Sequence, residues 1–379
     1  MASLYVTTSD EHLQPALPIR CSSEEKELQN ILYRSPAELL VGEQIEPDAP
    51  RRWLLIKREM PIPDPITGYG RWAIDFLYVD QDATLTFVEC KRYEDNRSRR
   101  EVIGQVIDYV ANASRWWTKD ALVDYARGQA AIDHVDLDGR FGQLGASDYT
   151  TIEELLAAAA DKLRKNDVRI ILFLEEAPPE LKTIVEFMNQ EMSTAEVLLV
   201  EARIFDVNGT RVYAPRLWGY TEAIRARRQA IAVATGARIK WDETSFFVDL
   251  DQRVANGADR DVIRTTYKAL REHGFVCTFG TGATAASFNV RWPAICNLSL
   301  MTVRSDGILT GPFGGLSDPT LRPLQDRLVA VYRKAGLAVP DDYPKRWVNY
   351  GLADWAPRAE FLVMGFGALM QPAAEREAP

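Results

Sequence analysis

The chain has 379 residues, of which 46% are hydrophobic and 26% charged, and this composition is typical of a globular protein with two domains. Its net charge of −9 excludes a surface coated in basic residues, so any contact with nucleic acid would depend on a local basic patch. Three scattered histidines and four widely spaced cysteines argue against a zinc site, a disulfide framework or a histidine-based catalytic triad.

The sequence carries no recognisable targeting or membrane signal. Its first fifteen residues lack the basic and apolar regions of a secretory signal, and the apolar run at 361–370 is too short to cross a bilayer. We therefore expect a cytoplasmic protein that makes no contact with a membrane.

Residues 1–222 predict an α/β domain. The expected elements are a helix from Ser22 to about Tyr33, strands at 52–59, 72–80 and 84–92 with a loop at 60–71, a helix at 98–116, further helices including 151–165, a strand at 168–175, a helix at 178–192 and a strand at 195–207. This order, αβββα followed by β, α and β, predicts a mixed sheet with helices on both faces.

The rest of the chain predicts a linker helix at 223–240, an α+β accessory domain at 241–371 and a flexible tail at 372–379. The accessory domain shows no catalytic pattern in its sequence. Its expected elements are a helical region at 241–271, short strands at 275–281, 286–292, 298–304 and 307–312, and helices at 318–335 and 357–370.

Three ionisable residues interrupt the apolar strands within 72–92, although strands buried on both faces are normally almost wholly apolar. If the turn between them is centred on Asp82, Asp75 and Glu89 lie opposite each other, and Lys91 projects from the same face as Glu89. The two carboxylates repel each other, and a bound Mg²⁺ or Mn²⁺ ion would relieve that repulsion. The alternative is a buried ion pair of Lys91 with Glu89 beside a partly exposed Asp75.

This spacing matches a known motif. Asp75, thirteen intervening residues and then Glu89-Cys90-Lys91 resemble the D…ExK signature of the PD-(D/E)XK, or restriction-endonuclease-like, nuclease superfamily. Ile74 stands where the proline of the motif's name would be. The resemblance covers about residues 20–220 and implies a restriction-endonuclease-like αβββαβ core.

The following helix carries a second match. Gln105 and Tyr109 fit the QxxxY motif of the RecB-like branch of the superfamily, and residues at i and i+4 lie on one helix face. The resemblance implies a catalytic role for both side chains. For Tyr109, a place in the core is the alternative.

A glutamate on the first helix completes the metal site in many members of this family. Mismatch-type endonucleases show it three residues before a leucine and some way before a proline, which here selects Glu25, with Leu28 and Pro36. Glu24 and Glu27 are the alternatives, because glutamates are common at helix starts.

The resemblance implies a metal-dependent nuclease that hydrolyses DNA by in-line attack of a metal-activated water. Asp75, Glu89 and Glu25 would bind Mg²⁺ or Mn²⁺, and Lys91 would position or activate the water. RNA as substrate and a homodimer are left open. The alternative is a catalytically silent module of the same fold that binds nucleic acid or scaffolds a repair or defence complex.

A basic run follows the ExK strand directly. Residues 91–100 hold five basic side chains in ten, and a run of this kind is either a solvated loop or a contact for the DNA backbone. The residues expected to bind nucleic acid are Arg92, Arg97, Arg99 and Arg100.

Overall fold

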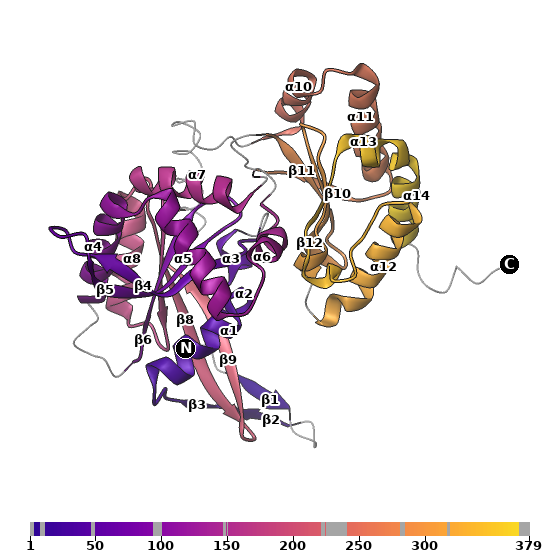
Figure 1. Cartoon of the computed structure of the whole chain (residues 1–379). Helices are drawn as coiled ribbons and strands as arrows, with labels where there is room; N and C mark the ends of the chain where they lie inside the picture. Colours follow the sequence, from indigo (N-terminus) through magenta and orange to yellow (C-terminus); the bar gives the residue numbers. More distant parts are fainter. Residues whose placement is uncertain are drawn as a thin grey trace. The chain divides into compact units, whose positions relative to one another are not determined.

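The computed structural model divides into two compact units, which Figure 1 shows in ribbon form. Unit 1 comprises Met1–Glu46, Arg51–Arg140 and Tyr149–Arg228, and unit 2 comprises Pro47–Pro50, Phe141–Asp148 and Gln229–Pro379. The residues that the structure describes are 4–7, 12–46, 50–93, 101–146, 149, 151–220, 224, 241–280, 285–316 and 319–370.

The division between the units falls inside the predicted linker helix. Of that segment, 223–240, only Ile224 is among the described residues, and the predicted tail at 372–379 lies outside them as well. Two short segments, 47–50 and 141–148, group with unit 2, and no feature of the sequence predicts this.

Unit 1 is built on a mixed sheet. In the described part of the chain this sheet has seven strands in the order β3-β8-β7-β6-β5-β4, with β9 paired to β8. Their bounds are β3 Leu17–Ile19, β4 Leu54–Pro63, β5 Gly70–Val79, β6 Leu85–Lys91, β7 Arg169–Leu174, β8 Glu196–Val207 and β9 Thr210–Trp218. β6, β7 and β8 are parallel, and the other pairs are antiparallel. The predicted mixed α/β class is therefore correct at this level.

Helices cover both faces of the sheet. They are a π-helical turn at Glu25–Gln29, α1 Asn30–Arg34, α2 Pro36–Leu39, α3 Gly42–Ile45, α4 Glu101–Trp116, α5 Lys119–Ile132, α6 Leu137–Leu144, α7 Ile152–Arg164 and α8 Pro179–Glu191. On one face Val88 and Ile171 belong to a core that includes Leu32 of α1. On the other face the ring of Phe87 stacks on that of Trp117, with 5.6 Å between their centroids.

The prediction of a loop over 60–71 is wrong at both ends. β4 continues to Pro63 and β5 begins at Gly70, so only the residues from Asp64 to Tyr69 form the turn between them. β4 is an edge strand of the described sheet, and an edge strand tolerates prolines because one side of it has no partner that needs their missing N–H groups. No pattern in the sequence predicts β9, whose side chains lack a buried apolar run.

Unit 2 contains a second sheet, which is antiparallel and has the strand order β10-β11-β12-β13-β14 among the described residues. Its strands are β10 Val276–Phe279, β11 Ser287–Trp292, β12 Cys296–Arg304, β13 Leu309–Gly311 and β14 Val348–Tyr350, and its helices are α10 Glu243–Arg253, α11 Gly257–Glu272, α12 Arg322–Lys334, α13 Leu352–Trp355 and α14 Ala359–Leu369. The unit has its own core, in which Phe246, Phe288 and Trp355 are fully buried.

The single helical region predicted at 241–271 is two helices, α10 and α11. The break lies at Val254–Asn256, where the Asn256 side chain accepts a hydrogen bond from the backbone N–H of Ala258 and begins α11. Within the described ranges, no helix of either unit combines the length and the apolarity that crossing a membrane requires.

A buried charge cluster joins three strands of the sheet in unit 1. Arg169 on β7 is 1% exposed, and its Nη1 donates to Oδ2 of Asp80 at 2.8 Å while its Nε donates to Oε2 of Glu196 at 2.7 Å. Asp80, which follows β5, is fully buried, and Glu196 begins β8. Each of these ions has a close partner of opposite charge, so the loss of one partner would leave a buried charge uncompensated.

We expect Arg169→Met to lower the free energy of unfolding by about 3–5 kcal/mol, because it removes the closest cation of the buried Asp80. Urea denaturation followed by tryptophan fluorescence measures this loss. The control is Arg164→Ala, which breaks an exposed ion pair with Asp161 and is expected to cost about 1 kcal/mol or less. Equal losses in the two variants would contradict a structural role for the buried cluster.

Candidate functional site

The hairpin of β5 and β6 has the register that the sequence predicts. Its ladder runs from Val79↔Leu85 to Phe76↔Val88, so the turn is centred on Asp82. Asp75 and Glu89 stand one step beyond the end of this ladder. Because side chains alternate along a strand, both point to the face opposite to Phe76 and Val88.

The backbone ladder between β5 and β6 ends at Phe76 and Val88. Beyond it, the side chain of Asp75 links the two strands. The backbone N–H of Cys90 donates to Oδ2 of Asp75 at 2.7 Å. Asp75 is 8% exposed and Glu89 is 2% exposed, so both carboxylates are largely removed from water. The structure thus brings two buried acidic side chains to the same end of one hairpin.

Lys91 provides a cation for one of the two carboxylates. Its Nζ lies 2.9 Å from Oε1 of Glu89. The other oxygen of Glu89, Oε2, is buried and has no hydrogen-bond partner among the described residues. A buried carboxylate oxygen without a partner costs free energy, so this atom marks a position that a ligand of positive charge would satisfy.

The charges in the site shift one another's ionisation. Burial, followed by repulsion from Glu89, raises the pKa of Asp75 to about 8. Burial also raises the pKa of Glu89, although Lys91 partly opposes this change. Burial alone would lower the pKa of Lys91, but attraction to Glu89 and Glu24 outweighs it and raises the pKa well above the usual range. Lys91 is therefore an ammonium ion at neutral pH.

The N-terminal helical segment contributes two side chains. Oε1 of Glu24 lies 3.6 Å from Nζ of Lys91, and Oε2 of Glu24 accepts from the backbone N–H of Arg92 at 3.2 Å. The amide of Gln29 donates to Oδ1 of Asp75 at 2.9 Å. No motif in the sequence points to Gln29, whose only signal is a polar residue beside the apolar positions of this helix.

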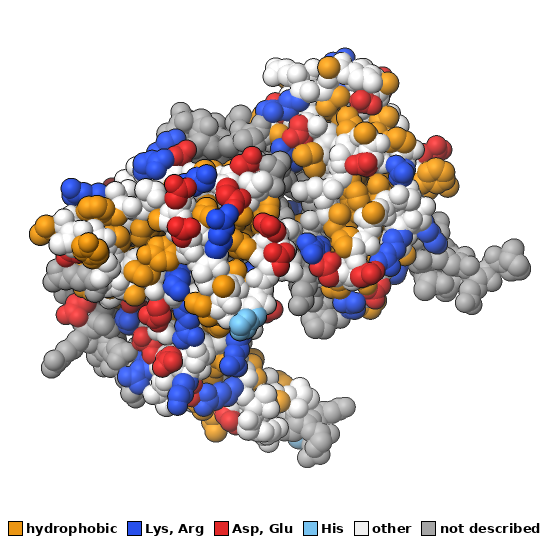
Figure 2. All heavy atoms as spheres, in the orientation of Figure 1, with side chains coloured by type: hydrophobic (Ala, Val, Ile, Leu, Met, Phe, Trp, Pro, Cys, Tyr) orange, Lys and Arg blue, Asp and Glu red, His pale blue; other side chains and the backbone are white. Residues whose placement is uncertain are grey.

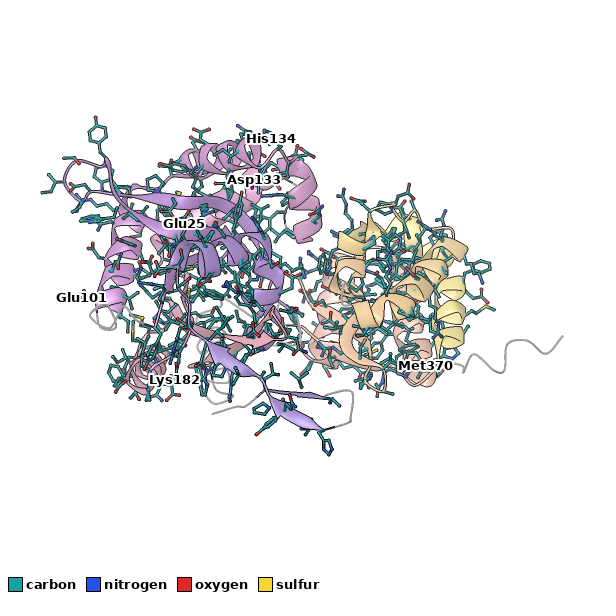
Figure 3. All side chains as sticks on the ribbon, turned by 90° about the horizontal axis from the view of Figure 1, so that it is seen from below. Glu25, Glu101, Asp133, His134, Lys182 and Met370 are labelled. Carbon is teal, nitrogen blue, oxygen red and sulfur yellow. The ribbon has the colours of Figure 1, made fainter. Side chains whose placement is uncertain are left out.

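Glu25, the helix glutamate that the sequence selects, is labelled in Figure 3. It lies on the π-helical turn, and its side chain is exposed. Glu24 instead approaches Lys91, and Glu27 accepts from the backbone N–H groups of Ser22 and Ser23. The physical reason is the π-helical geometry, in which hydrogen bonds join residues five apart. Residues 24 and 29 therefore lie on the same side of this turn.

Gln105 and Tyr109 lie together on α4. Nε2 of Gln105 donates to the hydroxyl of Tyr109 at 2.5 Å. Tyr109 is buried, its ring centroid is 6.4 Å from that of Trp72 on β5, and its pKa is raised by burial, with a smaller contribution from Glu89. The electrostatic influence of Glu89 indicates that this pair borders the acidic site.

Of the four predicted DNA-binding arginines, only Arg92 is described. Its Nη1 donates to the backbone oxygen of Ser22 at 3.2 Å, so it contacts the chain just before the first helical segment. The other three, Arg97, Arg99 and Arg100, lie outside the described residues, so their role in binding DNA stays a prediction.

Glu175, which sequence reasoning missed, connects the segments on either side of the site. It is buried just after β7, and its two oxygens accept from the backbone N–H groups of Cys21 at 3.0 Å and Tyr93 at 3.2 Å. These contacts hold the start of the first helical segment against the end of the ExK strand. The only sequence signal for Glu175 is a carboxylate directly after an apolar strand.

The donor set fits a hard divalent cation in part. Within the part of the chain that the structure describes, no three His, Cys, Asp or Glu side chains gather into a metal-binding cluster. Mg²⁺, however, is commonly held by one or two carboxylates and takes its other ligands from water and substrate phosphate. Asp75 and Glu89, with the unsatisfied Oε2, match this smaller requirement.

No family model matches the chain, and no similar protein was found among curated proteins or among solved structures. The case for a function must therefore come from the site itself, and above all from Asp75, Glu89 and Lys91.

We expect the ionisation of Asp75 to make the protein less stable as the pH rises. Its pKa is about 8 in the folded state and lies near 4 in an unfolded chain, so its stabilising contribution is complete below about pH 4 and is lost by about pH 8. In EDTA, the free energy of unfolding of the wild type relative to Asp75→Asn should fall across this range.

Urea denaturation at a series of pH values measures this difference, and Asp161→Asn, at an exposed carboxylate, is the control. A difference between the wild type and Asp75→Asn that stays constant from pH 4 to 8 would contradict the raised pKa.

Proposed function

We propose that this chain is a metal-dependent nuclease with a restriction-endonuclease-like core, which hydrolyses phosphodiester bonds in DNA. The observation that carries the proposal is the pair of buried carboxylates at the end of the β5–β6 hairpin, with an ammonium group 2.9 Å from one of them. The order of elements, with helical segments followed by β4, β5 and β6, then α4 and β7, supports the same core.

Each side chain of the site has its own proposed role in phosphodiester hydrolysis. Asp75 and Glu89 would hold Mg²⁺ or Mn²⁺, with Glu24 close by. When bound, the ion would supply charge neutralisation at the phosphate and a lower pKa for the attacking water. The neighbouring carboxylates of Glu89 and Glu24 raise the pKa of Lys91 and so favour its protonated form. We assign it to orienting the water and to stabilising the negative charge that develops on the phosphate.

Gln105 and Tyr109 support a nucleic-acid substrate. Their side chains are joined by a hydrogen bond, and Tyr109 lies close enough to Glu89 to be affected by its charge. An amide and a phenol at the border of an acidic site supply neutral donors, which suit a phosphate that is already balanced by a cation.

A second candidate is the catalytically silent module of the same fold. The observation that favours it is the Lys91–Glu89 ion pair, because such a pair stabilises a buried glutamate without any metal. Titration calorimetry with Mg²⁺ and Mn²⁺ separates the two candidates. Binding that Asp75→Asn removes supports the nuclease, and a protein indifferent to both ions supports the silent module.

We expect Asp75→Ala and Lys91→Ala each to reduce DNA cleavage by about 100-fold or more, because Asp75 would hold the metal ion and Lys91 would stabilise the charge that develops on the phosphate. The measurement is cleavage of plasmid and of a panel of oligonucleotides with Mg²⁺, with Mn²⁺ and with EDTA. Circular dichroism shows whether each variant is folded. Full activity in either folded variant would refute the assigned roles.

The neighbouring glutamates Glu24 and Glu25 provide a matched pair of variants. We expect Glu24→Gln to weaken Mg²⁺ binding by about tenfold, because its carboxylate lies 3.6 Å from Lys91 and influences the pKa of Asp75. Glu25→Gln changes an exposed side chain and should leave the affinity unchanged. Calorimetry measures both, and the reverse order of effects would return the metal role to Glu25.

A further inference from the structure

The turn between β4 and β5 presents the two most exposed large hydrophobic side chains among the described residues. Ile66 is 87% exposed and Tyr69 is 80% exposed. Figure 2 shows hydrophobic side chains gathered at the end of this hairpin, which projects beside α4 in Figure 1. The side chains of Ile66 and Tyr69 contribute little to the core, so folding stability does not explain why they are apolar.

The turn is held in a defined conformation. Oδ1 of Asp64 accepts from the backbone N–H groups of Ile66 at 2.9 Å and Thr67 at 3.0 Å, and the N–H of Asp64 donates to the oxygen of Tyr69 at 2.7 Å. Gly68 has a φ of +75° and packs so closely on α4 that a Cβ atom there would lie 2.8 Å from the ring of Trp116. The exposed side chains are therefore presented by an ordered turn, which lowers the entropy cost of binding.

This tip belongs to the same hairpin as the candidate site. Tyr69 precedes Asp75 by six residues, which corresponds to at most about 20 Å along an extended strand. Between them, Trp72 contacts Tyr109 at 6.4 Å between ring centroids. Beside the tip, the guanidinium of Arg115 lies 5.8 Å from the ring of Trp116. An aromatic surface with a cation at its margin suits the bases and phosphates of a nucleic acid.

We propose that Tyr69, with Ile66 beside it, stacks on an unpaired base of the DNA that the candidate site cuts. The inference rests on the proposed nuclease function and specifies its substrate class as DNA with unpaired bases within about 20 Å of the scissile phosphate. Bases in an intact duplex already stack on each other, so an exposed aromatic tip gains most from a strand whose bases are free.

The test measures the binding of the full chain to a fluorescently labelled single-stranded oligonucleotide, and to its blunt duplex, by anisotropy in EDTA. Tyr69→Ala should weaken single-strand binding by about tenfold, because one stacked base is lost, and should change duplex binding little. Tyr69→Phe keeps an aromatic ring and should bind like the wild type. The matched control is Phe361→Ala, which removes an exposed ring from α14 of unit 2.

The outcomes separate this inference from the nuclease proposal, because binding is measured without metal and cleavage is measured with it. Cleavage by the wild type together with equal single-strand binding by Tyr69→Ala and the wild type would overturn the stacking inference alone, and would mean that the tip contacts something else. Binding that depends on Tyr69 without any cleavage would overturn the nuclease proposal alone. A chain that binds neither oligonucleotide in EDTA and cleaves neither with Mg²⁺ or Mn²⁺ would overturn both.

Discussion

The candidate site depends on one constraint, the antiparallel register between β5 and β6. A shift of one residue would send Asp75 or Glu89 to the opposite face of the sheet, where apolar side chains form a core. The turn around Asp82 is held by Asp80, whose Oδ1 accepts from two backbone N–H groups of the turn while its Oδ2 pairs with Arg169. The buried Asp80 thus helps to fix the strand alignment that positions Asp75.

This alignment is electrostatically unfavourable by itself. Two carboxylates are removed from water at one point, and Lys91 lies within ion-pair distance of only one of them. Hydrogen bonds from Gln29 and from the backbone of Cys90 stabilise Asp75, yet its pKa stays far above that of an exposed aspartate. Strongly shifted pKa values of this kind cluster at functional sites, and they also occur in structural ion-pair networks.

The sequence predicts the β5–β6 hairpin, because side chains alternate between the two faces of a strand. The hairpin register follows from its apolar strands and short turn, and the facing of Asp75 and Glu89 follows from the register. The exposed position of Glu25 is not predictable from the sequence, because a π-helical turn changes which residues share a side, and no composition signal predicts that turn. The roles of Gln29 and Glu175 in the site cannot be predicted from the sequence either, since each acts through contacts with residues distant in the chain.

The break between α10 and α11 is a local feature, and Asn256 before Gly257 is the signal for it.

The prolines at the rim of the sheet have a consequence for self-association. β4 is the outer strand of the described sheet on that side, and Pro61 and Pro63 lack the N–H groups that another chain would need for regular pairing. Growth of the sheet by addition of a second copy at this rim is therefore suppressed. The hairpin can project from the molecule and expose apolar side chains at its tip without becoming a template for aggregation.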